Sequence, residues 1–308
     1  MQRLGLFILL LFTISAYAQQ EPLFSQYYVN NMPINPAVSG SAPYNHFSIQ
    51  TRQQWLGFEG APLTTYISYD GALNNRSAMG GYVLLDRAYP STQVAGHLNY
   101  AYHIPLDYDN INLSFGIGAK VMYHNLNFNT ADELPPGQDD AFSLASHNQS
   151  LADASAGVYL YSRQFYFGFS SSNLLESSFN DAITNSPHPN SEFRNYYGMG
   201  GYRFFITNRD WQLEPSFLIR KMHSFPAITD LTARILYQEN LWSGITYRTD
   251  GTAVFSFGFG SGVLHCSYSY DHTFNGDIQK YSYGTHEIGL SLRVVPFTDK
   301  RSNVFWGY

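Results

Sequence analysis

The amino-acid sequence predicts an all-β protein, namely a single transmembrane antiparallel β-barrel of about fourteen strands. Three observations predict this fold. The chain begins with a segment typical of export, and its composition is 17% aromatic with only 13% charged residues. About fourteen later segments alternate between polar and apolar residues, as strands do when one face meets lipid and the other a lumen.

The first eighteen residues have the pattern of a secretory signal peptide. Arg3 supplies a positive charge, residues 4–14 are apolar, and Ala16-Tyr17-Ala18 is a small-x-small cleavage site. The apolar stretch is shorter than the ~20 residues that a membrane-spanning helix needs. We therefore expect cleavage after Ala18.

Residues 19–45 form an irregular N-terminal segment that contains "LFSQYYVNNMPINPAVSGS". It shows no alternation, and the two X-Pro steps at Pro33 and Pro36 oppose a helix. Three roles are open: a plug folded into the lumen, a periplasmic docking surface, or a flexible tail. The candidate plug or partner residues are Phe24, Gln26, Tyr27, Tyr28, Asn35 and Pro36.

Residues 46–295 are expected to form the barrel, followed by a C-terminal tail at 296–308. In "HEIGLSLRV" (286–294), apolar residues alternate with polar or small ones. The strands begin near His46, Thr64, Ala78, Thr92, Asn110, Leu151, Gln164, Asn195, Trp211, Ala227, Leu241, Thr252, Val263 and Thr285. Tight turns alternate with longer loops, as in outer-membrane barrels, and an even strand count places both termini on the periplasmic side. A soluble β-sandwich would explain the strands but not this alternation of link lengths.

Charges of both signs fall on the polar faces of the expected strands. A charge inside a narrow barrel is costly unless it is paired or hydrated. Mixed signs allow pairs across neighbouring strands, such as Glu214 or Arg220 with Asp230 or Arg234. We therefore expect ion pairs to cross the lumen in place of a wide channel. The candidate lumen charges are Arg52, Glu214, Arg220, Asp230, Arg234 and Arg293.

Several function classes are disfavoured by the sequence. The net charge of −6 opposes nucleic-acid binding, and the single cysteine, Cys266, excludes an internal disulfide. There is no G-x-S-x-G motif. The "FGFGSG" segment at 257–262 lacks the strand-to-helix context of a phosphate-binding loop. We expect neither catalysis nor a cofactor nor a metal site.

Two groups of motifs resemble one known family. The first is "FSQYYVNNMPINPAVSGS" followed by "RQQWLGFEGAPLTTYISYDGAL", with the pattern carried by Phe24–Tyr27, Asn35–Gly40, Arg52–Trp55 and Gly60–Thr64. The second comprises "LEPSFLIRK", "PAITDLTARILYQENLWSGITYR" and "YDHTFNGDIQKYSYGTHEIGLSLR". Together they resemble the PorP/SprF family, outer-membrane β-barrels associated with the type IX secretion system of Bacteroidetes. The resemblance covers nearly the whole mature chain.

This resemblance implies an outer-membrane location in a Gram-negative, Bacteroidetes-like cell and no enzymatic activity. It implies an accessory barrel needed for export or surface attachment of a large adhesin that carries a C-terminal sorting domain. Some family members associate with periplasmic secretion or gliding-motility components. The alternative is a passive or ligand-selective outer-membrane transporter or porin, because a barrel of fourteen strands can also enclose a path for small molecules.

Overall fold

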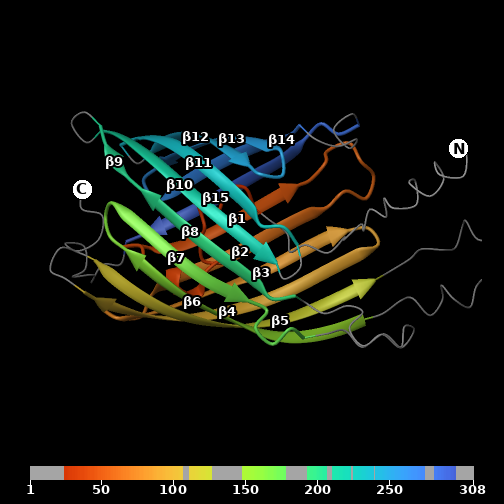
Figure 1. The fold of residues 1–308 in the computed structure, drawn as a ribbon, viewed down its shortest axis with the longest axis horizontal. Coiled ribbons are helices and arrows are strands. Elements are labelled where there is room, and N and C mark those ends of the chain that lie inside the picture. The colour runs from red at the N-terminus through yellow and green to blue at the C-terminus, as the bar shows by residue number, and fades with distance from the viewer. Residues whose placement is uncertain are drawn as a thin grey trace, which may run out of the picture.

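The structure is a computed structural model that describes residues 24–106, 111–126, 148–177, 193–206, 210–222, 225–238, 240–274 and 281–295. Fourteen strands form one closed antiparallel barrel (Figure 1), which confirms the predicted fold class. They are β1 (Asn45–Gln53), β2 (Leu63–Ala72), β3 (Ser77–Ala88), β4 (Ser91–Pro105), β5 (Asn112–Leu126), β6 (Asn148–Tyr161), β7 (Phe165–Ser172), β8 (Asn195–Tyr202), β10 (Trp211–Met222), β11 (Ile228–Tyr237), β12 (Leu241–Arg248), β13 (Thr252–Ser261), β14 (Leu264–Thr273) and β15 (Thr285–Val294). The ring closes where β10 pairs with β11. The expected signal peptide at 1–18 and tail at 296–308 lie outside the described residues.

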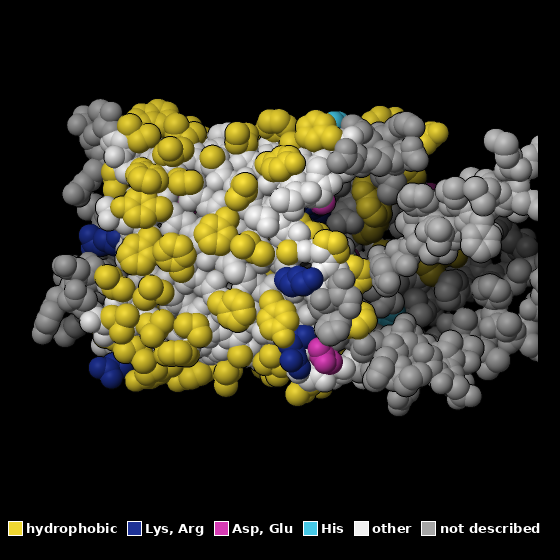
Figure 2. Space-filling view, viewed as in Figure 1, with side chains coloured by type: hydrophobic (Ala, Val, Ile, Leu, Met, Phe, Trp, Pro, Cys, Tyr) yellow, Lys and Arg dark blue, Asp and Glu magenta, His cyan; other side chains and the backbone are white. Residues whose placement is uncertain are grey.

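The two faces of each strand meet different surroundings, because successive side chains on a strand point to opposite sides. On β15, Ile288 is 57% exposed on the outside of the barrel, whereas its neighbour Glu287 is fully buried inside. Figure 2 shows hydrophobic side chains spread over the outer wall, with the few charged ones nearer the two ends. An apolar outer wall around a polar interior is the arrangement that a lipid bilayer requires.

One short extra strand, β9 (Phe204–Phe205), lies beside the fourteen strands of the barrel. Both β8 and β9 pair with β10, and the pairing is interrupted between them at Arg203. In this register Glu214 of β10 lies opposite Arg203, and the next residue, Pro215, has no N–H to donate to a ladder. The eighth wall strand is therefore split into two pieces.

The links between strands divide the barrel into two unlike ends. At the end where β15 finishes, the links have two to six residues, such as 162–164 and 262–263. We call this the short-link end; it is on the left in Figure 1, where the C-terminus is marked. At the opposite, long-link end, the links range from the hairpin at 89–90 to the 22 residues of 173–194. The loops expected at 132–140 and 180–192 lie outside the described residues.

Residues 24–44, which we call the lumen segment, lie inside the barrel. Their side chains and backbone make hydrogen bonds to strands on all sides of the ring, among them β1, β6, β10 and β14. The segment contains one short 3-10 helix, η1 (Pro36–Val38), which Asn35 caps by accepting a hydrogen bond from the Ala37 N–H. In the part of the chain that the structure describes, no helix is long and apolar enough to span a membrane.

Candidate functional site

Two tyrosines of the lumen segment form hydrogen bonds with strands β10 and β13 of the barrel wall. Tyr27 is 1% exposed, and its hydroxyl lies 3.0 Å from that of Ser216 on β10. The Tyr28 hydroxyl donates to Ser256 on β13 at 2.6 Å. Burial raises the pKa of both tyrosines, so their hydroxyls stay protonated at neutral pH. The two rings also contact each other edge-on, with centroids 5.3 Å apart.

The middle of the segment is held by hydrogen bonds from side chains to backbone carbonyl groups. The Asn35 amide donates to the carbonyl of Val158 on β6 at 3.1 Å. In return, the Ser170 hydroxyl of β7 donates to the carbonyl of Ile34 at 2.7 Å. Buried backbone groups need such partners, and here they come from strands about 120 to 140 positions away. These bonds add to the turn and 3-10 hydrogen bonds that the segment makes within itself.

Glycines in the wall make room for the segment. A Cβ at Gly116 of β5 would collide with the backbone of Ala37, and one at Gly157 of β6 would collide with the Asn35 side chain. Only a residue without a Cβ allows so close a backbone approach. The inner wall is thus shaped around the lumen segment at η1.

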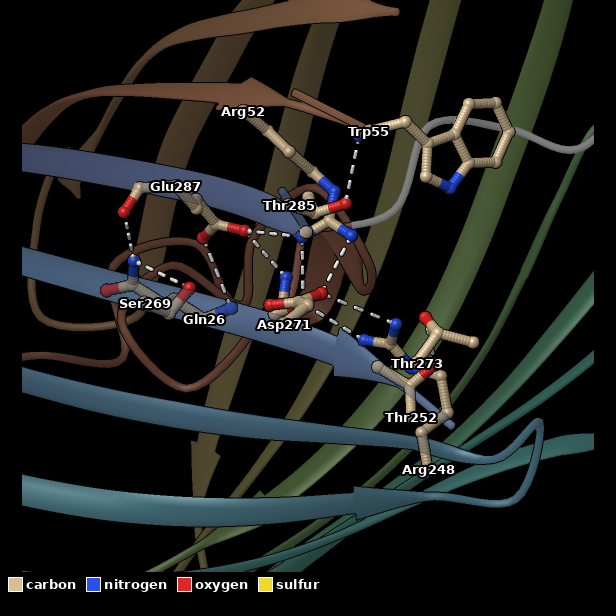
Figure 3. A network of polar contacts seen from close by, with 12 residues as sticks. Gln26, Arg52, Trp55, Arg248, Thr252, Ser269, Asp271, Thr273, Thr285 and Glu287 are labelled. Atoms are coloured by element: carbon tan, nitrogen blue, oxygen red, sulfur yellow. Dashed lines mark hydrogen bonds and ion pairs between the residues drawn. The ribbon is translucent and has the colours of Figure 1, made fainter. Parts of the chain in front are cut away.

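Six charged residues form a chain of ion pairs along one half of the ring toward the long-link end, and Figure 3 shows four of them, Arg52, Arg248, Asp271 and Glu287. Each member comes from a different strand and is at most 7% exposed. Arg52 contacts Asp271 at 2.8 Å and Glu287 at 3.3 Å. The chain continues from Asp271 to Arg248 at 3.7 Å. In order it comprises Glu287, Arg52, Asp271, Arg248, Asp230 and Arg220. Three positive and three negative charges balance, as buried charges require.

Ser25 of the lumen segment lies at the centre of this chain. Its backbone N–H donates to Glu287 at 2.8 Å, and its hydroxyl donates to Asp271 at 2.6 Å. The same hydroxyl accepts from Arg52 at 2.9 Å and from Arg248 at 3.1 Å. One small residue therefore connects the segment to four strands, three through its hydroxyl and one through its backbone N–H.

A second group of charges lies nearer the short-link end. Glu214 of β10 accepts hydrogen bonds from Arg203 at 3.0 and 2.8 Å and also pairs with Arg234 of β11. The guanidinium of Arg234 lies 4.2 Å from the centre of the Tyr28 ring. This contact combines an ion pair with a cation–π interaction, and it joins the lumen segment to the wall.

The structure brings most of the sequence candidates together. Glu214 pairs with Arg234, and Arg220 pairs with Asp230, each across neighbouring strands. Arg293 joins neither group; it lies 5.3 Å from the Tyr44 ring at the short-link end.

In the lumen segment, Phe24 contacts Tyr66 edge-on at 4.7 Å, and the Gln26 N–H donates to Glu287. Pro36 is the first residue of η1. Sequence reasoning did not single out Ser25, Asp271, Arg248 or Glu287 as site residues, although the last three occupy polar positions in alternating strands.

The direction of the lumen segment differs from the sequence expectation. An N-terminal segment was expected to start on the side of the short turns, but Ser25 lies with Arg52 and Glu287 toward the long-link end. From there the segment runs back to Asn45, where β1 begins at the short-link end. The charged residues that satisfy Ser25 lie at the long-link end, and this fixes the direction.

Among the described residues, no group of three or more His, Cys, Asp or Glu side chains could hold a metal ion. The six charges of the chain pair with one another. The arrangement serves to fix a segment of the chain inside a barrel.

Comparisons with known proteins agree with this fold. The chain resembles the CymD monoaromatic hydrocarbon channel at 10% identity, covering 85% of this chain and 91% of that one, with a TM-score of 0.51. It also resembles a TodX deltaS2S3 mutant monoaromatic hydrocarbon channel at 11% identity, covering 87% and 94%, with a TM-score of 0.51. At these identities the likeness concerns the fold alone. A search among curated proteins gave no match.

The sequence itself matches one protein family over most of its length. The family is described as type IX secretion system membrane protein PorP/SprF, and the match spans residues 16–292. The closed barrel, its apolar outer wall and this match together place the protein in the outer membrane. The chain belongs to the PorP/SprF family of type IX secretion system membrane proteins.

Proposed function

We propose that this protein is an accessory barrel of the type IX secretion system, needed for export or surface attachment of a large adhesin-type client with a C-terminal sorting domain. In this role it catalyses no reaction and needs no cofactor. It acts by binding, and periplasmic secretion or gliding components are its further partners.

The observation that carries the proposal is the filled lumen. The lumen segment contacts walls on all sides, and Ser25 joins it to the six-residue charge chain. A client polypeptide that passed through this barrel would have to displace the segment. The protein therefore supports secretion from its surfaces, and the translocated chain takes another path.

The test is a pull-down in mild detergent from outer membranes of the native host, followed by mass spectrometry. The proposal expects a very large surface protein with a C-terminal sorting domain to dominate the captured material. Deletion of the gene should remove that protein from the cell surface, as measured by its loss from surface-protease digests, and a plasmid copy should restore it. Capture of the barrel alone, with normal surface display in the deletion strain, would contradict the proposal.

The second candidate is a transporter for small solutes, favoured by a hollow of about 210 Å³ between the lumen segment and the wall at the short-link end. A transporter needs this hollow to connect to the other end of the barrel. Swelling of liposomes that contain the purified protein, in small sugars or organic acids, would favour this candidate over the accessory role.

A further inference from the structure

The hollow at the short-link end is a chamber with a distinct lining. Its floor is the lumen segment, and its walls are the ends of strands that meet the short links, including β6, β8, β12 and β15. Eight aromatic side chains line it: Tyr28, Tyr44, Tyr159, Tyr161, Phe165, Tyr166, Tyr202 and Trp242. Ligand sites in proteins are concavities with mostly apolar, aromatic linings and a few placed polar groups.

The charges of the chamber do not balance. Among the described residues that line it, three arginines face two carboxylates. Arg203 and Arg234 share Glu214. The second carboxylate, Asp70, accepts a hydrogen bond from the Gly40 N–H at 2.9 Å and lies 3.5 Å from His46. Both carboxylates are therefore engaged without Arg293.

Arg293 is the cation of the chamber that lacks a carboxylate partner within the described part of the chain. Its guanidinium lies 5.3 Å from the Tyr44 ring, and its side chain is only partly buried. Arginine presents a planar fork of donors that suits a carboxylate. A cation held against an aromatic ring, beside an aromatic-lined hollow, can pair with an anion whose remaining part is apolar.

We propose that this chamber binds an organic carboxylate with an aromatic or apolar body, the carboxylate pairing with Arg293 and the body packing on the tyrosines. Two sources supply this chemistry: a small aromatic acid, and the free C-terminal residue of a polypeptide. The chamber has a volume of about 210 Å³, just below the roughly 300–1,000 Å³ of common ligand pockets, so it takes a small acid or the last residue of a polypeptide. The lumen segment closes the floor, so the ligand enters from the short-link end. This site does not depend on the proposed secretion role.

The test is calorimetric titration of the purified full-length protein in detergent with two pairs of probes. One pair is 3-phenylpropionate and its amide, and the other is the tripeptide Gly-Gly-Phe and its C-terminal amide. Arg293→Gln removes the charge and keeps most of the side chain. Arg76→Gln is the matched control, because Arg76 is exposed in the 73–76 link at the same end of the barrel.

We expect at least one carboxylate to bind, and its amide and the Arg293→Gln variant each to weaken binding about tenfold or more. Arg76→Gln should leave binding unchanged. Binding of phenylpropionate alone identifies a small acid as the source, and tighter binding of the tripeptide identifies a polypeptide end. No binding of either acid, or equal binding of acids and amides, would overturn the proposal. The amide comparison uses the unaltered protein, so it holds even where Arg293→Gln fails to fold.

Discussion

Substitution of Gly116 by alanine tests whether the lumen segment is built into the wall. A Cβ at this position of β5 would lie against the backbone of Ala37 and Pro36, which cannot rotate away as a side chain can. Overpacking of this kind costs about 1–3 kcal/mol. The matched control is Gly96→Ala on β4, where a Cβ meets no heavy atom within 4 Å. Alanine in a strand is otherwise about 0.5–1 kcal/mol more favourable than glycine, so the two substitutions should change stability in opposite directions.

The assay combines urea unfolding in liposomes with the accessibility of a single thiol. Cys266 is replaced by serine, and Ser39, which is fully buried with a hydroxyl that makes no hydrogen bond, is replaced by cysteine. We expect Gly116→Ala to lower the unfolding free energy and to speed reaction of this thiol with a water-soluble maleimide. Gly96→Ala should do neither. Equal stability and equal labelling rates in the two variants would refute the reasoning.

Further predictions concern the anchors of the lumen segment. Glu287→Gln leaves Arg52 with one fewer carboxylate partner and should lower the free energy of unfolding in urea by about 3 kcal/mol. The control Asp210→Asn, at an exposed position, should change this free energy by no more than about 0.5 kcal/mol. Equal changes in the two variants would contradict a stabilising role of the charge chain. Ser25→Ala removes a hydroxyl that serves three charged side chains, and unfolding should show a loss of about 1–3 kcal/mol. Burial raises the pKa of Tyr28 in the folded protein. The contribution of its hydroxyl to the free energy of unfolding is therefore complete below the tyrosine pKa of the unfolded chain, about 10, and is lost as the pH rises above that value. Tyr28→Phe should therefore flatten the alkaline decline of stability, and an unchanged slope would contradict this.

The barrel could be predicted from the sequence because its strands meet two very different environments. Lipid outside and polar groups inside impose an alternation that survives without any knowledge of strand partners, as at Ile288 and Glu287. The positions of the turns could also be predicted, because tight links and long links alternate along the chain. The break at Arg203 was not predicted. It lies opposite Glu214 and beside Pro215 of the neighbouring strand, and the register between strands cannot be inferred from either strand alone.

For the lumen, the sequence predicted the type of interaction, namely ion pairs, but only some of the partners. Mixed charges on inward faces favoured ion pairs, and neighbouring strands gave Glu214 with Arg234 because their alternation brings them onto one face. The hydrogen bonds that hold the lumen segment could not be predicted, because partners such as Ser25 and Glu287 are 262 positions apart and no periodic pattern links them. An irregular segment carries no period from which its contacts could be inferred.

The most direct test of the central claim is single-channel recording in planar bilayers, because the claim is that the chain's own residues 24–44 fill the lumen. The account predicts no large, stable conductance for the full chain, and a measurable one for a variant that lacks residues 24–44, which serves as the control for insertion. A large, stable conductance of the full chain, equal to that of the deletion variant, would contradict it and would make the transporter reading the leading one.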